Sequence, residues 1–116
     1  MRMRTPTAQA TYHVVHFADG TEAAGFVAAL SRFLESPRWH APPGHLDVEV
    51  WSDARPTAGG VALYLSDGAL AATAAGFVAP PVTGSCRGAQ LPGKSALLLG
   101  EDAPALGFGD VRGLTV

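Results

Sequence analysis

Residues 12–28 read YHVVHFADGTEAAGFVA, and residues 61–79 read VALYLSDGALAATAAGFVA. Each stretch begins with a β-type run, passes through Asp-Gly and ends in a helical segment that contains AAGFVA. Asp and Gly behind a strand are residues that start turns and cap helices. The two stretches therefore predict two strand–turn–helix units. An internal repeat relating 11–52 to 61–100 is one interpretation, and chance similarity in an Ala- and Gly-rich chain is the other.

The helix expected over 21–36 has the most regular pattern in the chain. Its apolar side chains recur at helical spacing and form one stripe: Phe26, Leu30, Phe33 and Leu34. Asp19 is placed to cap the helix, with Glu22 three residues later as a capping box requires. Pro37 disfavours helical geometry at the residue before it and ends the helix.

Two further segments alternate between apolar and polar residues, as strands with one buried face do. These segments are LDVEVWS (46–52) and VALYLS (61–66). Ser66 or Asp67 is expected to cap a second, Ala-rich helix that runs to about Phe77.

The remaining strands are expected at 95–101 and 111–116. The resulting order is strand, helix, strand, strand, helix, strand, with one strand added at the C-terminus. We therefore predict an α+β fold, a two-layer sandwich with the ferredoxin-like βαββαβ order. Residues 1–10 are expected to be a flexible N-terminal lead-in, and 11–116 a single domain.

In this arrangement both helices would cover one face of the sheet and leave the other uncovered. The uncovered face would carry two large aromatic side chains, Trp51 and Tyr64, together with Asp47 and Glu49. One histidine of the first strand would also lie there. We further expect the first and third strands to be parallel neighbours, which would bring two helix N-termini together as a natural anion site. Each Asp of the two Asp-Gly turns is nevertheless better explained as a helix cap.

Composition excludes several classes of function. The net charge is −2, so the chain lacks the basic face typical of nucleic-acid binders. A single cysteine excludes an internal disulfide framework. No apolar run approaches the length of a membrane span, and the N-terminus is not a secretory signal. These features indicate a cytoplasmic protein that contacts neither membrane nor nucleic acid.

Two motifs resemble catalytic sites but stand in the wrong context. Residues 88–95 match the P-loop pattern G-x-x-x-x-G-K-[ST], yet too little chain follows them for a nucleotide-binding sheet. A turn between strands explains them better. Residues 84–88 resemble a nucleophile elbow with Cys86 at its centre. Such an elbow needs a helix directly after it and a histidine later in the chain. The residues that follow, Ala-Gln-Leu-Pro, are a poor start for a helix, and the last histidine of the chain is His45. A structural, half-buried cysteine is the better interpretation.

The four histidines do not predict a metal site. His13 and His16 are three residues apart on a strand and therefore point to opposite faces. His40 and His45 lie in a loop without zinc-site spacing. We expect neither a metal nor a cofactor.

The expected function follows from the uncovered sheet face. We predict a small non-catalytic domain, homodimeric, that binds a partner protein or small ligand through Asp47, Glu49, Trp51 and Tyr64. Large aromatic area is a major source of binding energy. The alternative is a small dimeric α+β-barrel enzyme. In it, His13 or His16 would transfer protons together with a tyrosine, Tyr64 or Tyr12.

Overall fold

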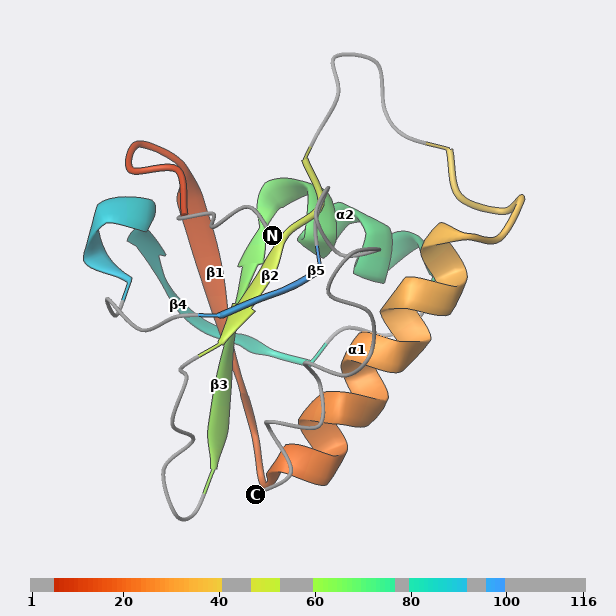
Figure 1. The fold of residues 1–116 in the computed structure, drawn as a ribbon, viewed down its shortest axis with the longest axis horizontal. Coiled ribbons are helices and arrows are strands. Elements are labelled where there is room, and N and C mark those ends of the chain that lie inside the picture. The colour runs from red at the N-terminus through yellow and green to blue at the C-terminus, as the bar shows by residue number, and fades with distance from the viewer. Residues whose placement is uncertain (1–5, 41–46, 53–59, 77–79, 92–95, 100–116) are drawn as a thin grey trace.

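The computed structural model describes residues 6–40, 47–52, 60–76, 80–91 and 96–99. Its elements follow one another as β1 (Thr11–Phe17), α1 (Gly20–Leu34), β2 (Val50–Ser52), β3 (Val61–Ser66), α2 (Asp67–Gly76), β4 (Val82–Arg87), the 3-10 helix η1 (Gly88–Gln90) and β5 (Ala96–Leu99) (Figure 1). The five strands form one antiparallel sheet in the spatial order β4-β1-β3-β2-β5. The chain is thus an α+β domain, as the sequence predicts.

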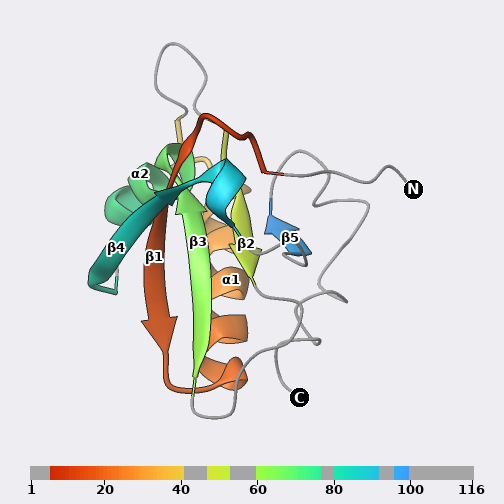
Figure 2. The ribbon, with the colours of Figure 1, turned by 90° about the vertical axis from the view of Figure 1, so that its left-hand side faces the viewer.

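Both helices lie on the same side of the sheet (Figure 2). The main core fills the space between them, and the α1 stripe supplies Phe26, Leu30 and Phe33 to it. The Asp19 carboxylate accepts a hydrogen bond from the Glu22 backbone N–H at 2.9 Å, so the predicted cap of α1 is confirmed. The opposite face of the sheet carries a second cluster, in which Tyr12, Trp51 and Leu91 are buried.

The pairing of β1 with β3 corrects one expectation. The two strands are neighbours, but they are antiparallel, with Tyr12 opposite Ser66 and Phe17 opposite Val61. The turn into α1 therefore leaves one end of the sheet and the turn into α2 leaves the other. The predicted side-by-side helix N-termini, and the anion site built on them, are wrong.

Strand β2 is shorter than the expected 46–52 because its partner β3 ends early. The chain leaves β3 at Ser66 and turns directly into α2. Beyond Val50, the ladder is continued by one backbone bond, from Ser66 N–H to the Glu49 carbonyl at 3.0 Å. The apolar alternation itself is confirmed, since Val50 lies in the main core and Trp51 in the opposite cluster.

The strand that follows α2 is Val82–Arg87, not the expected 95–101. This edge strand pairs only with β1 among the described strands and is exposed along most of its length. Its residues therefore show no apolar alternation that could reveal it. Residues 96–99 instead form β5, which pairs with β2 at the other edge. The further strand expected at 111–116 lies outside the described residues.

Residues 7–10 of the expected lead-in form a turn that is bonded to the start of η1. The Ala10 and Ala8 carbonyls accept from Gly88 N–H at 2.9 Å and from Ala89 N–H at 3.1 Å. The Arg87 guanidinium donates to the Gln9 carbonyl at 2.7 Å. These contacts hold the turn against the end of β4, beside the start of β1.

The core stripe of α1 yields a stability prediction. Leu30 is fully buried and Arg32 is exposed on the same helix. We expect Leu30→Ala to cost about 2–5 kcal/mol of unfolding free energy, because it leaves a cavity. Arg32→Ala should stay within about 0.5 kcal/mol. Urea melts of both variants would test the assignment, and equal losses would contradict it.

The contact between η1 and the 7–10 turn yields a second prediction. A Cβ atom at Gly88 would lie 1.9 Å from the Thr7 carbonyl oxygen, whereas one at Gly84 would meet nothing within 4 Å. Gly88→Ala must therefore push the two backbones apart, and we expect it to cost about 1–3 kcal/mol or more. Gly84→Ala, in the neighbouring strand, is the matched control and should lose no more than about 0.5 kcal/mol. Thermal melts that rank the two variants equally would refute the close approach.

Candidate functional site

A buried carboxylate lies at the centre of the cluster opposite the helices. Glu49 is only 3% exposed, and its Oε1 accepts two side-chain hydrogen bonds. The Tyr12 hydroxyl donates to it at 3.0 Å, and the Trp51 indole Nε1–H donates to it at 2.8 Å. A carboxylate can be removed from water only when donors of this kind replace its hydration. Glu49 therefore joins β1 to β2 across the intervening strand.

Tyr12 extends this network to the N-terminal turn. Its hydroxyl accepts from the Thr7 backbone N–H at 3.0 Å while it donates to Glu49. Burial raises the pKa of Tyr12 above its ordinary value of 10.0. The hydrogen bond from Thr7 acts in the opposite direction, and the negative charge of Glu49 raises the pKa further. The phenol thus stays protonated and continues to donate to Glu49.

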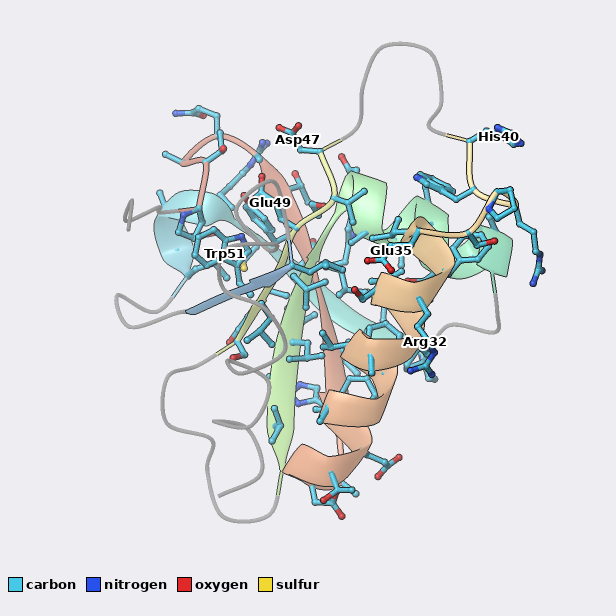
Figure 3. The ribbon with its side chains drawn as sticks, turned by 45° about the vertical axis from the view of Figure 1, so that its right-hand side comes forward. Arg32, Glu35, His40, Asp47, Glu49 and Trp51 are labelled. Carbon is cyan, nitrogen blue, oxygen red and sulfur yellow. The ribbon has the colours of Figure 1, made fainter. Side chains whose placement is uncertain are left out.

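An open pocket of about 200 Å³ adjoins this network. Three segments form its walls: the approach to β1, the segment before β2 and the first turn of α2. The lining residues are Thr7, Ala10, Thr11, Tyr12, Asp47, Glu49, Ser66, Asp67 and Gly68. Three of these side chains are carboxylic acids, and no lysine or arginine belongs to the described lining. Figure 3 shows Asp47, Glu49 and Trp51 in succession along the segment that leads into β2.

The α2 wall of the pocket is held by Ser66 and Asp67. The Ser66 hydroxyl accepts from Ala69 N–H at 3.1 Å, so Ser66 caps α2. The Asp67 carboxylate is free to bond elsewhere, and its Oδ1 lies 2.6 Å from His13 Nε2. Ser66 was predicted as one of two possible caps, and the structure selects it.

The structure places the predicted ligand-binding residues on one side of the sheet but not on an exposed patch. Trp51 is fully buried and Glu49 nearly so, whereas Tyr64 is half-buried and Asp47 is exposed. The expectation of an exposed Trp51 is therefore wrong. Leu91, which follows η1, packs with Trp51 and Tyr12 on that face, and Figure 2 shows η1 on the side of the sheet away from the helices. Whether these residues bind a ligand stays a prediction.

The residues predicted for proton transfer are divided between the two faces. His13 shares a face with the core residues Val15 and Phe17, and its ring contacts Asp67. His16 lies on the opposite face and is exposed. Tyr64 packs against the cluster of Tyr12 and Trp51. The enzyme alternative stays a prediction. None of His13, His16 and Tyr64 belongs to the described lining of the pocket.

Sequence reasoning gave no site role to Ser66 or Thr7, and considered Tyr12 only as an alternative in an enzyme. Tyr12 precedes His13 in a strand, so alternation puts it on the face of Trp51, and this signal could have identified it. Thr7 contributes a backbone N–H, which no side-chain pattern reveals. Asp67 was interpreted as a helix cap, and its position beside β1 follows only from the antiparallel pairing.

The catalytic lookalikes do not form catalytic geometry where they are described. Cys86 lies within β4, not at a strand-to-helix elbow, and burial raises the pKa of its thiol. A nucleophilic cysteine needs the opposite shift. Residues 88–90 form a 3-10 turn after β4, and 92–95 of the P-loop pattern lie outside the described residues. Within the described ranges, no group of three metal-ligating side chains could hold an ion.

In the part of the chain that the structure describes, no helix has the length and apolar character needed to cross a membrane. Comparison of the chain with protein-family models, with curated proteins and with solved structures finds no match. The geometry of the site is therefore the basis on which a function can be proposed.

The raised pKa of Tyr12 predicts how stability depends on alkaline pH. Because the folded state holds this proton more tightly than the unfolded chain, the contribution is complete below pH 10.0 and is lost as pH rises through the higher folded pKa. Urea melts of the wild type should show this loss. Tyr12→Phe should flatten the decline, whereas Tyr64→Phe should keep it. An unchanged decline in Tyr12→Phe would show that Tyr12 does not cause it.

Proposed function

We propose that this chain is a small non-catalytic domain that binds a small molecule through a positively charged group, in the pocket beside Glu49. The observation that carries the proposal is the lining of that pocket. Asp47, Glu49 and Asp67 belong to its lining and come from two different segments, and no lysine or arginine belongs to the described lining. The Asp67 carboxylate also bonds to His13, outside that lining. A cation placed between carboxylates gains Coulomb energy that grows as water is excluded.

The dimensions of the pocket support a small ligand. Pockets for drug-sized molecules occupy roughly 300–1,000 Å³, and this one is about 200 Å³. An alkylammonium group or the end of a longer amine is compatible with that volume. Thr7, Thr11 and Tyr12, which also line the pocket, are polar residues.

Binding is favoured over catalysis by the position of the candidate proton-transfer groups. His13, His16 and Tyr64 do not belong to the described lining of the pocket. The Tyr12 hydroxyl does, but it is engaged by both Thr7 and Glu49. A general acid or base must reach the proton that it transfers. The enzyme is therefore the weaker proposal.

We also propose that the fold is ferredoxin-like. The element order βαββαβ and the neighbouring strands β4-β1-β3-β2 support this assignment, with β3 lying between β1 and β2. Strand β5 would be the addition at the C-terminal side, although it precedes the segment in which an extra strand was expected.

Homodimerisation remains a proposal, but the exposed tryptophan from which it was predicted no longer supports it. It was predicted from an exposed Trp51, and Trp51 is buried by groups of its own chain, including Tyr12 and Leu91. A dimer would have to use another surface.

The proposal is tested by titration with a cation and a matched anion. We expect n-butylammonium chloride to cause saturable chemical-shift changes at pocket amides, with a Kd on the order of 1 mM, about 4 kcal/mol. Sodium butanoate should cause none. Raised salt should weaken binding because charge attraction is screened.

Three variants make the test specific. Asp47→Asn and Asp67→Asn remove charges from opposite walls, and each should weaken n-butylammonium binding several-fold. Glu22→Gln removes an exposed carboxylate from the first turn of α1, at the other end of the sheet, and should leave the affinity unchanged. Equal binding of butanoate, or equal losses in all three variants, would contradict a cation site in this pocket.

A further inference from the structure

Ser66 stands where three parts of the pocket meet. Its hydroxyl donates to the Asp47 carbonyl at 2.7 Å and accepts from Glu49 N–H at 2.9 Å and from Ala69 N–H at 3.1 Å. A serine hydroxyl has one donor and two acceptor positions. All three are therefore used, and the residue is only 8% exposed.

The reason for this arrangement lies in the end of β3. Continuing the β2–β3 register by one residue beyond the Val50–Leu65 pair places Glu49 opposite Ser66, and a regular antiparallel pair at that position would exchange two backbone bonds. Among the described contacts one such bond is present, from Ser66 N–H to the Glu49 carbonyl. The carbonyl of an N-cap residue already accepts the first bond of its helix. The Ser66 hydroxyl takes the place of that carbonyl and accepts the Glu49 N–H.

We infer that Ser66 is the positioning residue of the pocket. Its one hydroxyl fixes the wall that carries Asp47 and Glu49 against the wall that carries Asp67 and Gly68. It thereby sets the Glu49 carboxylate in reach of Trp51 and Tyr12. A helix cap alone would need only the bond to Ala69. The consequence for ligand affinity rests on the proposed function, whereas the consequence for Glu49 does not.

The Trp51 indole reports the position of Glu49 directly. Its Nε1–H donates to Glu49 Oε1, so the chemical shift of that proton depends on the carboxylate. The chain has two tryptophans, and Trp39→Phe identifies the signal of Trp51. The measurement is made on the full chain, well below the melting temperature of each variant.

Ser66→Ala should shift the Trp51 indole proton toward the position of a water-exposed indole and weaken n-butylammonium binding several-fold. Thr73→Ala is the matched control. It removes another buried α2 hydroxyl, which bonds only to the Ala69 carbonyl, at 2.8 Å, among the described contacts. Thr73→Ala should leave the indole proton and the affinity unchanged. Equal indole shifts in the two variants would overturn the inference, because they would reflect general loosening of α2.

Two further variants separate positioning from capping. Ser66→Thr keeps the hydroxyl and should keep the wild-type indole position. Ser66→Asn keeps a good cap for α2 but cannot reproduce the three bonds of the hydroxyl, and it should shift the indole as Ser66→Ala does. A wild-type indole position in Ser66→Asn would reduce Ser66 to a helix cap. This comparison also decides the question if Ser66→Ala fails to fold.

The two proposals can fail separately. If the wild type does not bind n-butylammonium, the proposed ligand is wrong, and the indole proton still decides the role of Ser66. If the wild type binds it but Ser66→Ala leaves both the indole and the affinity unchanged, the positioning role is wrong and the ligand proposal stands.

Discussion

The burial of the Glu49 carboxylate is the constraint on which one side of this sheet depends. A charged group can leave water only if donors replace its hydration, and Tyr12 and Trp51 provide them. Each donor is in turn fixed in place: Tyr12 is bonded to Thr7, and Trp51 is packed in the cluster with Leu91. The polar network and the second apolar cluster are therefore one structure. Removing one partner of such a group costs more than the bond itself, because the other is left buried and unsatisfied.

The direction of β3 relative to β1 determines which chemistry can assemble at each end of the sheet. Antiparallel pairing carries the start of α2 to the start of β1, where Asp67 bonds to His13. It carries the start of α1 to the opposite end. Two acidic turns that look equivalent in the sequence thus have different roles: Asp19 caps its own helix, whereas Asp67 leaves capping to Ser66 and bonds through its carboxylate to His13.

The sequence predicted those parts of the fold in which local patterns and packing agree. The α1 stripe, its Asp19 cap and the alternation through Val50 and Trp51 are all confirmed. Strand β4 was missed because an exposed edge strand needs no apolar alternation. The burial of Trp51 was missed for a different reason. Alternation assigns a side chain to a face, but it cannot say that Leu91, forty residues later, will cover that face.

The pocket could not be predicted from the pattern of apolar and polar side chains, because hydrogen bonds to distant backbone groups join its parts. Asp47 and Glu49 were selected as site residues, but as part of an open face. What makes them a pocket is the Ser66 hydroxyl and the turn at Thr7, and both act through main-chain groups. Main-chain groups carry no side-chain signature, so the three-dimensional arrangement is needed to reveal these bonds.

The exposed edge at β4 is poorly suited to strand addition. Gly88 N–H bonds to the Ala10 carbonyl, so by alternation along the ladder the Arg87 N–H points away from β1. That donor is taken by the Gln90 side chain at 2.8 Å. A bulge opposite Val14 and Val15 interrupts the other half of the strand, and two prolines precede it. Natural proteins use bulges and prolines of this kind to prevent edge-to-edge pairing. The chain thus occupies or distorts its own free edge while it leaves the acidic pocket at the end of β3 open.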